Sequence, residues 1–259
     1  MAGPAVRDND TVSLYRDDGI VLRTQKLGEA DRIVTILTRR NGRVRAVGKG
    51  VRRTKSRFGA RLEPFTHVDL LLYTGRSLDV ITQAETVRAY GGPLAVDYPR
   101  YTSGTAMLET AERFTPIEKE PIIRQFLLLV GGLRALGERV HDPRLVLDAY
   151  LLRTLAVAGY APALDECAVC GTPDPVNTTG SRSFAVPAGG LTCRSCRPPG
   201  AASPAVATIA LMRSLLRGDW AQADISQARH QVECSGLVAA YVQWHLEHSI
   251  RSLRHVEHV

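Results

Sequence analysis

The sequence predicts an α+β protein with two domains, an N-terminal five-stranded β-barrel and a mostly α-helical domain that carries an inserted four-cysteine module. Three observations support this. Short segments rich in β-branched residues alternate with turns between positions 19 and 87, and apolar residues recur at helical spacing after position 91. Two CxxC pairs lie inside the helical part. We therefore expect domains at 1–90 and 91–259, with the cysteine module at about 164–199.

The first domain contains five candidate strands. Asn and Gly supply the positive φ that hairpin turns need at 40–42 and 74–77. A long basic connection, 49–64, separates the third and fourth strands and has room for a short helix. Five strands with a helix at this position match the oligonucleotide/oligosaccharide-binding (OB) fold. The expected strands are Gly19–Lys26, Arg32–Thr38, Arg43–Gly48, Thr66–Tyr73 and Leu78–Thr86.

The second domain begins after the Gly91-Gly92-Pro93 boundary. Five helices are expected there, and the third is apolar on most sides, which is typical of a helix in the centre of a core. They are Tyr98–Phe114, Pro121–Leu136, Pro143–Ala158, Pro204–Leu216 and Gly236–Leu253.

The charge is concentrated at one place. Between Arg32 and Leu62 the chain has eleven Lys or Arg residues and no Asp or Glu. Residues 1–90 carry a net charge of +7, whereas residues 91–259 hold 16 basic and 16 acidic side chains. This concentration of positive charge indicates a surface that binds a phosphate backbone. An ordinary solvated surface is the alternative, but such surfaces usually mix both signs of charge. The residues predicted to bind such a backbone are Arg39, Arg40, Arg43, Lys49, Arg52, Arg53, Lys55, Arg57 and Arg61.

The four paired cysteines are Cys167, Cys170, Cys193 and Cys196, with 22 residues between the pairs. Two such knuckles complete a tetrahedral sulfur shell, so we expect one Zn²⁺; disulfides, buried thiols or iron are the alternatives. Four protein ligands leave no open coordination position, which indicates a structural site. Cys234 stands alone.

Several function classes are disfavoured. The start of the chain does not read as a secretory signal, and no apolar run approaches the ~18 residues of a membrane span. We therefore expect a cytoplasmic protein without membrane contact, and binding to a phosphate backbone as expected above would make it nucleoid-associated. P-loop and HExxH motifs are lacking in the sequence, and we find no convincing nucleophile and base, so an enzyme is not expected.

The residues also resemble the RecO family of bacterial recombination mediators. The resemblance is carried by GIVLRT from Gly19, LGEADRIV from Leu27, KGVRRTKSRFG from Lys49 and LEPF from Leu62, and by the four-cysteine module. It implies an OB domain that binds single- and double-stranded DNA, a helical domain with a zinc-binding insertion, and annealing of complementary strands. It also implies joint action with RecR to load RecA on strands coated by single-strand-binding protein.

Two other functions compete with this interpretation. OB barrels and zinc ribbons occur in RNA-binding and ribosome-associated proteins, and a phosphate-seeking surface does not by itself distinguish DNA from RNA. A nuclease or nucleotidyl transferase would need clustered carboxylates, which the basic segment lacks. Aromatic residues make up only 6% of the chain, so we expect phosphate neutralisation rather than extended base stacking to dominate binding.

Overall fold

The computed structural model describes residues 13–54, 56–175 and 182–254, with side chains described up to Glu247. These residues form two compact units. The first contains the described chain up to Ala89 and, in addition, the short segment Ile117–Ile122. The second contains Tyr90–Pro116 and the chain from Ile123 onward. Segment Ile117–Ile122 lies in the predicted helical domain by sequence, yet it packs with the first unit.

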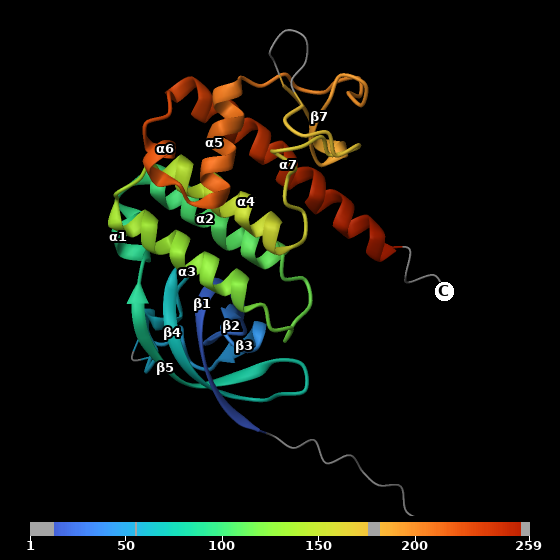
Figure 1. Cartoon of the computed structure of the whole chain (residues 1–259). Coiled ribbons are helices and arrows are strands. Elements are labelled where there is room, and N and C mark those ends of the chain that lie inside the picture. The colour runs from blue at the N-terminus through green and yellow to red at the C-terminus, as the bar shows by residue number, and fades with distance from the viewer. Residues whose placement is uncertain (1–12, 55, 176–181, 255–259) are drawn as a thin grey trace, which may run out of the picture. The chain divides into compact units, whose positions relative to one another are not determined.

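The first unit is a closed five-stranded barrel (Figure 1). The strand order is β1-β2-β3-β5-β4; β3 and β5 pair in parallel, and the remaining neighbours, including β4 and β1, are antiparallel. The predicted OB-like barrel is therefore confirmed, although β1 begins five residues earlier than expected. Its elements are β1 Leu14–Leu27, β2 Asp31–Thr38, β3 Gly42–Gly48, the 3₁₀ helix η1 Gly59–Leu62, β4 Thr66–Tyr73 and β5 Asp79–Ala89.

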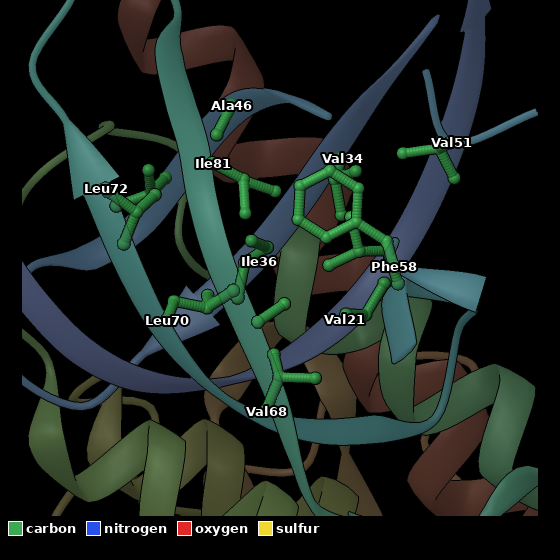
Figure 2. Close-up of a cluster of buried hydrophobic side chains, with 13 residues drawn as sticks. Val21, Val34, Ile36, Ala46, Val51, Phe58, Val68, Leu70, Leu72 and Ile81 are labelled. Carbon is green, nitrogen blue, oxygen red and sulfur yellow. The ribbon is translucent and has the colours of Figure 1, made fainter. Parts of the chain in front are cut away.

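The barrel interior is filled by aliphatic side chains from all five strands. Val34, Ile36, Leu70 and Ile81 lie close together in Figure 2 and are essentially inaccessible to solvent. The connection between β3 and β4 adds Phe58, which is only 1% exposed. Burial of this ring fixes one side of the connection in the core, whereas the described basic side chains of the connection are exposed.

The second unit is built around α4, as the apolar pattern of that helix predicts. Helix α4 packs against α2, α3, α5 and α7. Asp97 and Asp142 cap α2 and α4 by accepting hydrogen bonds from the backbone N–H groups of Arg100 and Arg144. The helices are α1 Gly91–Ala95, α2 Tyr98–Arg113, α3 Ile123–Glu138, α4 Pro143–Val157, α5 Val206–Arg217, α6 Trp220–Asp224 and α7 Ala228–Arg254.

The helical unit differs from expectation at three places. A short helix, α1, occupies the expected Gly91-Gly92-Pro93 boundary, and α6 was not predicted. Helix α7 begins eight residues before Gly236, which lies inside the helix and faces open space. In the part of the chain that the structure describes, no helix combines the length and apolar character needed to cross a bilayer.

The cysteine module is inserted between α4 and α5. Its regular structure is a two-stranded antiparallel sheet of β6 Ser183–Ala185 and β7 Gly190–Thr192, joined by the 3₁₀ turn η2 Val186–Ala188. Phe184 and Leu191 are buried, but the module has few other large apolar side chains.

Candidate nucleic-acid interface and metal centre

Three basic side chains gather on the connection between β3 and β4, and we call Lys49, Arg53 and Arg57 the loop cluster. They line a hollow of about 480 Å³ together with Asp31, Gly50 and Ser56. Gly50 has a φ of 68° and donates its N–H to Asp31 Oδ1 at 2.7 Å, so the chain reverses direction at the rim of the hollow. All three basic side chains are exposed.

The loop cluster has charge available for a ligand. Among the described residues, the side chains of Lys49 and Arg53 take no hydrogen-bond partner. The Arg57 guanidinium lies 4.7 Å from the centroid of the Phe58 ring, which orients it without neutralising it.

Two of the predicted residues help to hold this loop in place. Arg52 donates from Nη1 to Glu29 O at 2.9 Å and to Gly28 O at 3.2 Å, and these carbonyls belong to the β1–β2 turn. Arg61 donates from Nη1 to Arg57 O at 2.7 Å. Both side chains are exposed, but part of their hydrogen-bonding capacity is used by the protein itself.

Arg39 and Arg40 form a separate group, the turn cluster, on the hairpin between β2 and β3. Asp17, only 3% exposed, accepts hydrogen bonds from Arg40 N at 3.1 Å and Asn41 N at 3.0 Å, which fixes the turn. The turn lies at one end of β3 and Lys49 at the other. Seven residues at ~3.3 Å each separate the two clusters by about 23 Å.

The neighbourhood of the turn cluster is less basic than the sequence suggests. A hollow of about 440 Å³ beside it is lined by Arg16, Asp17, Asp18, His67 and Asp69 as well as by the two arginines. Its aspartates come from β1 and β4, outside the acid-free run. The two clusters therefore differ in local charge.

The remaining predicted residues are Arg43 and Lys55. Arg43 is half-buried on β3, and its carbonyl oxygen accepts from Lys119 N at 2.9 Å. Lys55 lies outside the described residues. Sequence reasoning missed that Arg43 and its neighbour Arg45 meet residues of segment 117–122, because this contact joins positions more than 70 residues apart.

The four paired cysteines come together as predicted. Their Sγ atoms all lie within 4.8 Å of one another, and Cys170 Sγ is 3.8 Å from Cys193 Sγ. A tetrahedral site with ~2.3 Å metal–sulfur bonds has sulfur–sulfur edges of about 3.8 Å. The four cysteines therefore provide a donor set that could bind one metal ion.

Backbone hydrogen bonds shape both knuckles. Gly171 N donates to Cys167 O at 2.9 Å, and the positive φ of Gly171, 72°, closes that turn. Cys196 N donates to Cys193 O at 3.2 Å. Cys193 N also donates to Cys167 Sγ at 3.3 Å, so one knuckle is tied to the other.

The thiols of this centre differ in acidity. Hydrogen bonds, chiefly with Ser195 and then with the backbone of Cys196, lower the pKa of Cys193 to about 6. The neighbouring sulfurs, Cys193 first and Cys170 second, raise the pKa of Cys196 to about 12. A divalent cation would remove this conflict, because its charge favours the thiolate form of all four ligands.

Arginines of α5 attach the module to the helical unit. Arg213 donates from Nε to Leu164 O at 3.0 Å and lies 2.8 Å from Asp165 Oδ1. Arg217 reaches the other oxygen of the same carboxylate at 2.8 Å. The first knuckle therefore follows directly after an anchored segment.

Two of the hollows in the helical unit have linings that could suit a ligand. One, of about 240 Å³, is lined by residues of α3, α4 and α6 that include Tyr150, Arg153 and Trp220. Arg153 donates from Nε to Leu215 O at 3.1 Å, whereas its buried Nη2 has no hydrogen-bond partner among the described residues. The other, of about 480 Å³, lies between α2, α4 and α7 and is lined mainly by apolar side chains such as Leu147 and Val242.

Comparison with known proteins agrees with this architecture. Residues 12–90 match the family model described as Recombination protein O N terminal, and residues 95–254 match Recombination protein O C terminal. A protein of Thermobifida fusca named DNA repair protein RecO is 69% identical over 246 residues, which cover 95% of this chain and 99% of that protein. Proteins of the same name from Streptomyces griseus and Nocardioides sp. are each 60% identical, over 95% and 94% of this chain and 100% and 99% of their own lengths. The chain belongs to the RecO family.

Proposed function

We propose that this protein is a DNA-binding recombination mediator that acts in DNA repair. The observation that carries the proposal is the loop cluster, three exposed basic side chains around one hollow on an OB-like barrel. Family membership supports DNA repair as the context, since the similar proteins are named DNA repair protein RecO.

Binding is expected to neutralise phosphates rather than to read bases. Phe58, the aromatic residue nearest the loop cluster, is buried in the barrel core and so offers no stacking surface. Contacts to phosphates are independent of sequence and leave base edges free. Two complementary strands held in this way can pair, so annealing needs neither ATP nor a chemical step.

The helical unit is proposed to bind protein partners. The family resemblance implies RecR, the acidic tail of single-strand-binding protein and, indirectly, RecA. The hollow beside Arg153 supports the second of these. A half-buried guanidinium whose Nη2 has no hydrogen-bond partner among the described residues lies next to Tyr150 and Trp220, and this combination suits a carboxylate attached to an apolar group.

The metal is proposed to be one structural Zn²⁺ held by Cys167, Cys170, Cys193 and Cys196. An all-thiolate tetrahedral set favours zinc, and it leaves no position open for substrate. Zinc would supply the folding energy of a segment that buries little apolar surface.

The deciding experiment is annealing of complementary oligonucleotides coated by the cognate single-strand-binding protein, with and without RecR. Annealing that depends on this protein and is lost when the loop cluster is neutralised supports the proposal. Competition between matched DNA and RNA tests the RNA-binding alternative, which gains support if RNA binds more tightly. Cleavage of labelled DNA in magnesium or manganese would instead indicate a nuclease.

A further inference from the structure

Arg45 occupies the middle of β3, between the loop cluster and the turn cluster. Burial alternates along this strand: Val44 and Ala46 face the barrel core, whereas Arg43 and Arg45 are only partly buried. The buried Nε of Arg45 has no hydrogen-bond partner among the described residues. The side chain as a whole remains partly exposed, so the terminal nitrogens of its guanidinium are the atoms that an anionic oxygen can reach.

The segment Ile117–Ile122, sequence IEKEPI, lies against this strand, and we call it the acidic strap. Glu118 forms a parallel bridge with Arg43, and the Lys119 N–H donates to Arg43 O at 2.9 Å. The approach is close: a Cβ added to Gly42 would lie 1.8 Å from Glu120 O. The glycine at the start of β3 therefore makes room for the strap.

A second contact anchors the strap to the barrel. Lys119 Nζ lies 2.9 Å from Asp79 Oδ1, and the Asp79 side chain is only 1% exposed. The same carboxylate accepts a hydrogen bond from Gly75 N at 3.1 Å and one from Tyr15 Oη at 2.5 Å. The Asp79 carboxylate thus accepts two hydrogen bonds from the barrel itself, and Lys119 adds an ion pair.

The contact between Glu118 and Arg45 is much weaker. Glu118 Oε1 lies 3.6 Å from Arg45 Nη1, which is within range of an ion pair but too long for a hydrogen bond. The two side chains are 36% and 34% exposed, so water and salt screen the attraction. A polyanion with several phosphates can displace such a carboxylate.

We propose that the acidic strap competes with nucleic-acid phosphate for Arg45 and thereby limits binding at the centre of the barrel. This inference rests on the proposed function, since it assumes that the barrel binds a polyanion. In the free protein Glu118 faces the guanidinium, and the barrel offers two separate basic clusters. When Glu118 moves away, Arg45 joins them into one continuous binding surface.

The test compares Glu118→Gln with Glu85→Gln in the full-length protein. Both variants remove one negative charge from the first unit, but Glu85 is an exposed residue of β5 that lies opposite Asp69 of β4. Binding to single-stranded DNA is measured over a range of salt concentrations. Glu118→Gln should steepen the slope of log K against log[salt] by about 0.7, the value of one added phosphate contact. Glu85→Gln should leave the slope unchanged.

A third variant shows whether Arg45 supplies the new contact. In the double variant Glu118→Gln/Arg45→Gln the slope should return to the wild-type value. Equal slopes for the two glutamate variants, or a gain that persists without Arg45, would overturn the proposal. If neutralising the loop cluster also leaves DNA binding unchanged, the loop cluster is not the binding site and the observation that carries the proposed function fails. If that neutralisation weakens binding while Glu118→Gln behaves like Glu85→Gln, the strap inference alone fails.

Discussion

Neutralising the loop cluster is the most direct perturbation of the barrel surface. The triple variant Lys49→Gln, Arg53→Gln, Arg57→Gln removes three positive charges around one hollow and keeps the loop ties made by Arg52 and Arg61. Phe58 and Leu62 still anchor the connection in the core. The fold should therefore survive, with a cost of about 0.5–1 kcal/mol from the lost contact of Arg57 with the Phe58 ring.

The magnitude follows from counterion release. Three lost phosphate contacts should flatten the slope of log K against log[salt] by about 2 for single strands and by about 2.7 for duplex DNA. Between 50 and 200 mM salt, a fourfold change, the affinity ratio of wild type to variant for single strands should shrink roughly 18-fold. Fluorescence anisotropy with a labelled oligonucleotide at several salt concentrations measures both slopes, and thermal unfolding confirms that the variant is folded.

The matched control is Arg124→Gln, Arg134→Gln, Arg144→Gln. These arginines are exposed on the helical unit, and their replacement changes the net charge by the same amount. If the control flattens the slope as much as the loop variant does, binding responds to overall charge and the loop cluster is not the site. An unchanged slope for the loop variant would place the DNA site elsewhere.

Three further predictions concern the helical unit. Elemental analysis of the wild type should find one zinc ion per chain. Cys193→Ser/Cys196→Ser should lose it, whereas Cys234→Ala, which alters a cysteine outside the cluster, should keep it. Burial raises the pKa of Asp148 to about 7, so the folded state holds a proton that the unfolded state releases near pH 4. The free energy of unfolding should therefore fall by up to about 4 kcal/mol as the pH rises from 4 to 7. Asp148→Asn should flatten this pH profile, which thermal melts measure. Arg153→Gln should weaken binding of a peptide with the acidic tail of single-strand-binding protein about tenfold or more in calorimetry, and equal affinity would exclude this hollow as its site.

The barrel strands could be predicted because the sequence patterns that indicate them extend over only a few neighbouring residues. Alternating burial along β3, turn residues at Asn41-Gly42 and a long connection before β4 all follow from periods and residue types within a few positions. The cysteine centre was predictable for the same reason, since each knuckle is a short motif. In both cases the physical cause of the structure lies next to the residues that show it.

The grouping of the basic residues was not predictable in this way. The acid-free run suggests one surface, yet the structure distributes it over two ends of a hairpin and a strand that faces Glu118. Arg52 donates hydrogen bonds to carbonyls of the β1–β2 turn, and Asp17 of β1 accepts a hydrogen bond from the backbone N–H of Arg40. Each of these partners is distant in sequence, so only the tertiary fold brings the charges together.

If the barrel binds nucleic acid as proposed, the spacing of the two clusters sets the length of the segment that both can contact. Strands β2 and β3 pair in continuous register from Arg32 and Gly48 to Thr38 and Gly42, so the hairpin acts as a spacer of fixed length. Phosphates of one strand in duplex DNA repeat every ~3.4 Å along the axis, and about 23 Å therefore corresponds to about seven nucleotides. A segment of that length could contact both clusters at once. Under the proposed function, its two ends would then be held while the bases between them stay free to pair.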